Sequence, residues 1–133
     1  MSENIISKQD YRHCVIGDDV YLLTHSKSHR RYNLSDIEQL IIPPINLGQA
    51  QLYKRSGKPV AYVSWAYLSE HIADRFSQDA YDLKIEDWQS GPHLWIMDFI
   101  APFGGVRHIA SQLKLQFPGK QGRWTRFDSS RNS

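Results

Sequence analysis

Residues 94–105 read Leu-Trp-Ile-Met-Asp-Phe-Ile-Ala-Pro-Phe-Gly-Gly, and the rest of the chain is organised around this stretch. It is an apolar run with one carboxylate, Asp98, in its middle, and it ends in proline and glycine before a helical pattern begins. Such a run is typical of a strand that is buried on both faces. A carboxylate in a buried strand is costly unless it is paired or hydrogen-bonded. The sequence therefore predicts a partner for Asp98.

Strands and helices around this run predict an α+β fold. Residues 49–55 and 59–66 read as two strands, and Ser56-Gly57-Lys58 between them has the length of a hairpin connection. A short helix with Leu68, Ile72, Ala73 and Phe76 on one side follows, and then comes a mostly polar segment anchored by Trp88. After the central strand we expect a helix that carries Val106, Ile109, Ala110, Leu113 and Phe117 and ends at Pro118-Gly119, and a last strand over 123–127.

Two helices are expected before the first strand. Gly17 and Asp18 predict a turn into a helix start, with Asp18 as the N-cap and Asp19 in the first turn. Val20 and Leu23 would face inward, with Tyr21 and Leu22 close by. Ser35 and Glu38 form a capping-box pattern for a second helix, which Pro43-Pro44 should stop.

The bulk composition is that of an ordinary globular protein. The 133 residues predict a single domain over 1–133, with residues 1–10 and 128–133 flexible. A net charge of +2 gives no push toward nucleic acid. Cys14 is the single cysteine, no run reaches the roughly 18 apolar residues of a membrane span, and the N-terminus lacks a signal-peptide pattern. We therefore expect a cytoplasmic protein without a membrane span.

Three residues are candidates for acid–base chemistry, each with a plainer interpretation. Asp98 either orients a histidine or is satisfied by backbone N–H groups or by an arginine such as Arg30 or Arg107. His29 suits general-base work, yet composition alone favours an exposed histidine after a helix. Ser26 is close enough in sequence to share a site with His29, although such hydroxyls more often bond to the local backbone.

Gly104-Gly105 and the remaining histidines carry weaker signals. A strand-to-helix junction presents free N–H groups that suit a phosphate, but two glycines also fit a tight turn. No histidine pair has the spacing of a zinc site, so we expect no metal.

Three blocks of the sequence carry a resemblance to a known family. The first is Ile16-Gly17 with Tyr-Leu-Leu-Thr-His-Ser-Lys-Ser-His-Arg over 21–30, the second is Pro-Val-Ala-Tyr-Val-Ser-Trp-Ala over 59–66, and the third is Glu-Asp-Trp-Gln-Ser-Gly over 86–91 with residues 94–104. In this order and spacing they resemble the RTX toxin-activating lysine acyltransferases, the enzymes that acylate pro-haemolysin-type toxins.

The resemblance implies a fold, an activity and a set of site residues. The fold would be GNAT-like, a mixed and largely antiparallel central sheet flanked by helices. The donor would be a fatty acyl thioester on an acyl carrier protein, and the acceptor an internal lysine of an RTX-type protoxin, with no tightly bound cofactor. His29 and Asp98 match the family's catalytic histidine and aspartate, and Ser26 its accompanying serine. The resemblance also leaves a homodimer open.

Under that mechanism, we expect the donor to bind near the end of the central strand. Backbone N–H groups around Phe103, Gly104 and Gly105 would receive the thioester oxyanion or the pantetheine phosphate. Trp65 would line the acyl chain together with Trp95 and Phe99, or these rings pack in the core.

The sequence also departs from the family pattern. The first-block aromatic residues are replaced by Tyr21 and Leu23, Tyr32-Asn33 stands in place of Trp-Pro, Leu40 in place of an asparagine and Phe99 in place of a tryptophan. Family members also tend to continue beyond the region where this chain ends. Two alternatives therefore stay open: an acyl-CoA-dependent acyltransferase for small amines, and a non-catalytic module that binds a toxin or a carrier.

Overall fold

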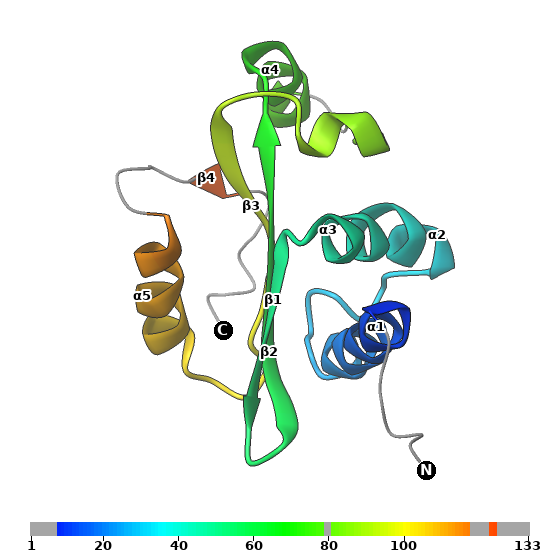
Figure 1. Ribbon diagram of the computed structural model, residues 1–133, viewed down its shortest axis with the longest axis vertical. Helices are drawn as coiled ribbons and strands as arrows, with labels where there is room; N and C mark the ends of the chain where they lie inside the picture. The colour runs from blue at the N-terminus through cyan, green and yellow to red at the C-terminus, as the bar shows by residue number, and fades with distance from the viewer. Residues whose placement is uncertain (1–7, 79–80, 118–122, 125–133) are drawn as a thin grey trace.

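A four-stranded sheet forms the centre of the molecule in a computed structural model that describes residues 8–78, 81–117 and 123–124 (Figure 1). Strands β1 (Ala50–Arg55), β2 (Lys58–Leu68), β3 (His93–Ile100) and β4 (Arg123–Trp124) lie side by side in that order. The first three pair antiparallel, and β4 pairs parallel to β3. The predicted α+β class, with a mixed and largely antiparallel sheet flanked by helices, is confirmed.

Helices cover both faces of this sheet. On one side lie α1 (Lys8–Thr24) and a continuous helical segment made of α2 (Leu34–Asp36), the π-helix η1 (Ile37–Ile41) and α3 (Ile42–Leu47), and on the other side lies α5 (Val106–Gln116) (Figure 1). Helix α4 (Glu70–Gln78) and the 3-10 turn η2 (Ile85–Trp88) lie at the end of the sheet where β2 finishes. In the described part of the chain, no helix is long and apolar enough to cross a bilayer.

The two faces of the sheet bury separate apolar cores. Neighbouring residues of a strand point to opposite faces, so Tyr62 and Val63 of β2 belong to different cores. The core under α1 and α3 consists of Val15, Leu22, Leu23, Ile41, Ile45, Tyr62 and Ile100. The core under α5 consists of Ala61, Val63, Trp65, Leu94, Ile96, Ile109 and Leu113. Asp98 lies two residues before Ile100 and therefore shares the α1 face.

The predicted strands and hairpin are present with small shifts at their ends. Ser56 and Gly57 form a two-residue turn with φ angles of 53° and 81°, which suits the right-handed twist of a hairpin. Opposite β3, the register places Ser64 across from Asp98, and a bulge follows between Ser64 and Trp65. Trp88 is fully buried, as expected of an anchor.

The prediction of a turn at Gly17 is wrong. Helix α1 runs without interruption from Lys8 to Thr24, so Asp18 is not an N-cap and Asp19 is not in a first turn. Glycine inside a helix costs about 1 kcal/mol relative to alanine, and the burial of Val15, Leu22 and Leu23 on the sheet outweighs that cost.

The inner face of α1 also differs from the prediction. Leu22 and Leu23 are buried, whereas Val20 is 37% exposed. The inner face differs because α1 starts ten residues before the predicted N-cap, so a different set of its side chains packs against the sheet.

The prediction that Pro43-Pro44 stops the second helix is also wrong. Both prolines lie buried inside α3, which continues to Leu47. A proline is tolerated in the first turn of a helix because its missing N–H needs no partner there. The preceding π-turn closes with the Ile42 N–H donating to the Ile37 carbonyl, so α3 effectively begins afresh at the prolines.

The capping box of this segment lies two residues earlier than predicted. The Asn33 side chain accepts from the Asp36 N–H, and the Asp36 carboxylate accepts from the Asn33 N–H, each at 2.9 Å. Asparagine is as good an N-cap as serine, so the two candidate pairs compete and the Asn33 pair forms.

Helices α4 and α5 match the predicted segments with two exceptions. Leu68 is buried but belongs to β2, and Val106 is 51% exposed although it was expected on the inner face of α5. The expected helix end at Pro118-Gly119, the residues 125–127 of the last strand and the flexible ends lie outside the described residues, apart from residues 8–10, which form the first turn of α1.

Replacing Gly17 with alanine tests the continuous α1 helix. We expect Gly17→Ala to raise the free energy of unfolding by about 0.5–1 kcal/mol, because an added Cβ meets no atom within 4 Å. Urea unfolding measures the change. A loss of stability would contradict the continuous helix and would support a turn at Gly17.

Gly91→Ala is the matched control, with the opposite expected sign. There an added Cβ would lie 2.3 Å from the Ser69 Cα and 2.8 Å from the Leu68 carbonyl oxygen, both backbone atoms. We expect a loss of about 1–3 kcal/mol from this overpacking.

Candidate functional site

The segment that follows α1 is folded by a series of tight turns. The His25 and Ser26 N–H groups donate to the Leu22 and Leu23 carbonyls at 3.0 and 3.1 Å. The His29 N–H then donates to the Ser26 carbonyl at 3.1 Å. Because Leu22 and Leu23 are buried in the core, these turns fix His29 relative to the sheet.

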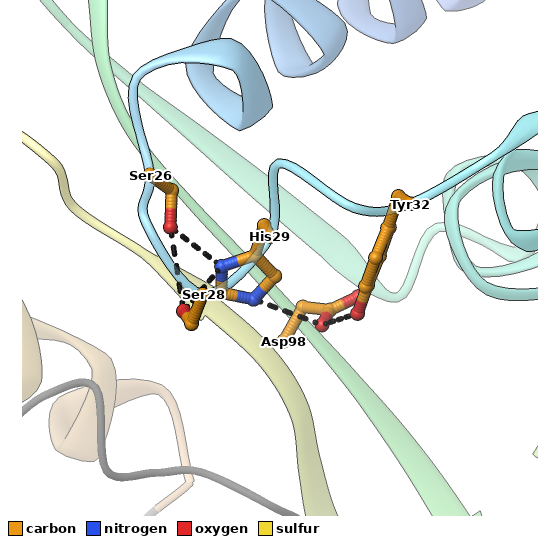
Figure 2. Close-up of polar contacts among 5 residues, drawn as sticks. All are labelled: Ser26, Ser28, His29, Tyr32 and Asp98. Atoms are coloured by element: carbon orange, nitrogen blue, oxygen red, sulfur yellow. Dashed lines mark hydrogen bonds and ion pairs between the residues drawn. The ribbon is translucent and has the colours of Figure 1, made fainter.

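His29 lies beside the carboxylate of Asp98. The His29 Nε2 is 3.5 Å from the Asp98 Oδ1, and the two side chains are 15% and 6% exposed (Figure 2). The partner predicted for Asp98 is therefore a histidine from a segment that precedes it by 69 residues. The plainer interpretation of His29 as an exposed loop residue does not fit this burial. Arg30 and Arg107, the alternative partners, both lie exposed.

Tyr32 is a second partner of Asp98 that the sequence analysis missed. Its hydroxyl donates to the same Oδ1 at 2.8 Å, so the carboxylate lies between Tyr32 and His29 (Figure 2). The rings of His29 and Tyr32 also meet edge to face, with centroids 5.3 Å apart. The signal in the sequence was the spacing, because residues 29 and 32 sit on successive turns; the Tyr32 N–H donates to the His29 carbonyl at 3.1 Å.

Two serine hydroxyls lie at the other nitrogen of the imidazole. The Ser26 Oγ is 2.6 Å from the His29 Nδ1, and the Ser28 Oγ is 3.0 Å from it (Figure 2). A carboxylate only accepts hydrogen bonds, so the tautomer that suits this contact has the ring proton on Nε2 and leaves Nδ1 to accept from a hydroxyl. In that tautomer the basic atom of the site is Nδ1, on the side of Ser26. Ser26 thus bonds to His29 through its side chain, unlike the plainer interpretation.

A second carboxyl group, Asp19 of α1, is buried on the same face of the sheet. Asp19 is fully buried, and neither of its carboxyl oxygens has a hydrogen-bond partner among the described residues. Burial, and after it the negative charge of Asp98, raises the pKa of Asp19 well above its ordinary value. The structure thus favours a neutral Asp19. The sequence offered no signal for this burial, since Asp19 was expected in an exposed first turn.

The floor of the site is made of polar groups from β2. Tyr62 and Ser64 are both fully buried, and Ser64 is paired across the sheet with Asp98. Burial raises the pKa of the Tyr62 hydroxyl well above 10, and the charges of Asp19 and Asp98 raise it further. Tyr62 therefore stays neutral near neutral pH.

The residues predicted to bind a donor are divided between two places. Phe103 is 50% exposed and contacts the His25 ring, with centroids 5.3 Å apart. Gly104 and Gly105 follow it with φ angles of 96° and 82°, and Gly105 is the N-cap of α5. Of these three residues, Phe103 is the one that lies beside the residue preceding Ser26.

Trp65 does not reach the site. It is 7% exposed and packs edge to face on Phe117, with ring centroids 5.1 Å apart, in the core under α5. Trp95 packs against Phe76 of α4 in a third buried cluster, with ring centroids 5.5 Å apart, and Phe99 lies partly buried against the core under α5. Of the two alternatives for these rings, core packing fits all three.

Metal binding has no support in the described residues. Within 8–78, 81–117 and 123–124, no three His, Cys, Asp or Glu side chains come together in a way that could hold an ion. What the arrangement offers is a histidine with serine hydroxyls at its Nδ1 and, beside its Nε2, a carboxylate that can stabilise the charged form of the ring.

Comparisons with known proteins point to one family. Residues 8–133 match the family model of the RTX toxin acyltransferases. The chain is 36% identical over 124 residues to the RTX-II toxin-activating lysine-acyltransferase ApxIIC of Actinobacillus pleuropneumoniae, which covers 93% of this chain and 76% of the relative. It is 36% identical over 114 residues to the protein-lysine myristoyltransferase RtxC of Kingella kingae, covering 86% and 68%. It is 34% identical over 114 residues to the protein-lysine myristoyltransferase HlyC of Escherichia coli, covering 86% and 67%.

The buried Asp19 makes the stability of the fold depend on pH. In the unfolded chain its pKa is about 3.9, and in the folded chain it is raised. Its contribution is therefore fully present below the unfolded pKa and is lost as the pH rises toward the folded pKa. We expect Asp19→Asn, which cannot ionise, to gain stability relative to the parent chain as the pH rises from 4, by up to about 1.4 kcal/mol per pH unit.

Urea unfolding at a series of pH values between 4 and 8 measures this difference. Asp18→Asn is the matched control, because Asp18 lies near the surface and pairs with Lys54 at 3.5 Å. A difference between Asp19→Asn and the parent that stays constant with pH would show that Asp19 is not a buried neutral acid.

Proposed function

Since the chain belongs to the RTX toxin acyltransferase family, we propose that it transfers a fatty acyl group from an acyl carrier protein to an internal lysine of an RTX-type protoxin. The observation that carries this proposal is the imidazole of His29, held between Asp98 and Ser26. Relatives of the chain carry the names lysine-acyltransferase and protein-lysine myristoyltransferase. The chemistry of that reaction needs a base, and the contacts of His29 with Asp98 and Ser26 support that role for it.

The acceptor lysine sets the first requirement. Its amine has a reference pKa of about 10.4 and is protonated at neutral pH, so it cannot attack until a proton is removed. An imidazole titrates near neutral pH and suits this task. In this site the available nitrogen is Nδ1, because Nε2 faces Asp98.

The proton can pass through Ser26 to His29. The Ser26 Oγ lies 2.6 Å from Nδ1, so it can take a proton from the amine while it gives its own to the ring. The amine then attacks the thioester carbonyl and forms a tetrahedral intermediate. The nitrogen of that intermediate still carries one proton more than the amide holds, and it loses that proton to solvent. As the C–S bond breaks, the amide forms, and the carrier thiolate takes the proton held by His29.

Asp98 and Tyr32 support His29 when it is charged. The imidazolium formed in the first step has two N–H donors, and the ionised Asp98 accepts the one on Nε2. The Tyr32 hydroxyl, at 2.8 Å from the same Oδ1, fixes the position of the carboxylate. The distance of 3.5 Å between Nε2 and Oδ1 is long for a hydrogen bond, and we expect it to shorten when substrate binds.

The donor would bind at the exit of β3. Backbone N–H groups around Phe103, Gly104 and Gly105 are our candidates for receiving the thioester oxyanion or the pantetheine phosphate. No side chain caps the start of α5 at Gly105, which supports this assignment. Trp65 has no part in it, because its ring packs on the opposite face of the sheet. The thioester itself supplies the activated acyl group, so the reaction requires no tightly bound cofactor.

Variants of the three central residues test the mechanism. We expect His29→Ala and Asp98→Asn each to lower the rate by about 100-fold or more, because the first removes the base and the second leaves the imidazolium without its charged partner. Ser26→Ala should retain partial activity if the amine attacks the thioester directly. The assay mixes the chain, an acyl-carrier thioester and an RTX protoxin, and follows acyl-lysine by mass spectrometry.

His71→Ala is the control, because His71 lies exposed on α4 at the far end of the sheet. Rates of acyl transfer that stay unchanged in His29→Ala and Asp98→Asn would contradict the proposed mechanism. Complete loss in Ser26→Ala, with an acyl group found on Ser26 in the parent chain, would replace direct transfer with a covalent intermediate. Equal use of acyl-CoA in a competition with acyl carrier protein would argue against the proposed donor.

A further inference from the structure

Three aromatic side chains form an exposed cluster beside Ser26. The rings of Tyr21, in the last turn of α1, and His25, directly after that helix, meet edge to face with centroids 4.8 Å apart. Phe103 comes from the segment after β3 and contacts both, at 5.3 Å from His25 and 6.5 Å from Tyr21. We call Tyr21, His25 and Phe103 the aromatic trio.

The trio is not part of either core. Tyr21 is 47% exposed and Phe103 is 50% exposed. In contrast, Leu22 and Leu23, which follow Tyr21, are buried in the core between α1 and the sheet. Large apolar side chains that gather at the surface often mark a binding site. The exposure of the trio therefore indicates a binding surface and not a part of the core.

The trio continues directly into the candidate site. His25 precedes Ser26, whose hydroxyl lies 2.6 Å from the His29 Nδ1. Phe103 lies five residues beyond Asp98, on the segment that leaves β3. A molecule whose reacting carbonyl is held at Ser26 and His29 can therefore extend over these rings.

The rings of the trio suit an apolar occupant. An aliphatic chain that covers the exposed faces of Tyr21 and Phe103 gains from the removal of both apolar surfaces from water. The acyl group is the apolar part of the donor whose carbonyl would react beside Ser26, so the position of the trio favours it as the occupant.

We propose that Tyr21, His25 and Phe103 form the surface that binds the acyl chain of the donor thioester. This inference rests on the proposed acyl transfer and assigns the place of its apolar group. The carbonyl carbon lies at Ser26 and His29, and the chain runs back along the exposed face of α1 under the Phe103 ring. A longer chain covers more of the trio, so binding strengthens with chain length.

The test compares a long and a short donor on the same carrier. Transfer rates are measured with myristoyl- and butyryl-acyl carrier protein for the parent chain, Tyr21→Ser and Phe103→Ser, with an RTX protoxin as acceptor. We expect the myristoyl rate to fall at least about tenfold further than the butyryl rate in both variants, because each methylene that loses its contact is worth about fourfold in binding. Phe103→Leu should restore most of the preference for the long chain.

Ile85→Ser is the matched control, because Ile85 is an apolar side chain that is 71% exposed on η2, far from the trio. It should leave both rates as they are in the parent. Equal losses with the two donors in Tyr21→Ser and Phe103→Ser would overturn the acyl-chain site and leave the proposed function standing. A parent chain that transfers neither acyl group would overturn the proposed function instead, and the acyl-chain site with it.

Sedimentation of the same proteins separates this site from a contact between two copies of the chain. A parent dimer that dissociates in Tyr21→Ser and Phe103→Ser, with both rates falling together, would assign the trio to a dimer interface and contradict the proposal.

Discussion

The contact between Asp98 and His29 is the constraint on which the rest of the site depends. The Asp98 side chain is only 6% exposed, and a buried carboxylate destabilises the fold unless other groups interact with it. Here the His29 imidazole and the Tyr32 hydroxyl do so. Both partners come from the segment after α1. That segment is held in place because α1 packs Leu22 and Leu23 into the core below. The position of His29 beside Asp98 therefore depends on three elements together: helix α1, the tight turns after it and strand β3.

Two buried groups near Asp98 favour their neutral forms. Asp19 and Tyr62 lie on the same face of the sheet as Asp98, and burial raises the pKa of each. Two ionised carboxylates side by side would repel each other, and a neutral Asp19 removes that repulsion. A neutral acid without a hydrogen-bond partner among the described residues costs stability, which natural proteins often accept at functional sites.

Much of the fold could be predicted from local patterns, because strands such as β2 and β3 are long apolar runs bounded by turn residues. Turn and stop residues predicted the wrong helix boundaries where the packing of apolar side chains outweighed the local preference. Gly17 reads as a turn but lies inside α1, and Pro43-Pro44 reads as a stop but begins a new helical turn. For the site, the need of Asp98 for a partner was predictable, and its identity came from the resemblance rather than from spacing. The spacing of residues 29 and 32 was a signal for Tyr32, and the sequence held none for Asp19, since only the tertiary structure brings Asp19 to Asp98.

The protonation of the His29 ring is the most direct test of the central claim. Long-range proton–nitrogen NMR on chain labelled with nitrogen-15 reports which ring nitrogen carries the proton at neutral pH. The contact with Asp98 predicts a proton on Nε2 and none on Nδ1, and a ring that loses this preference in Asp98→Asn. A neutral ring protonated at Nδ1, or one whose signals do not respond to Asp98→Asn, would contradict the account.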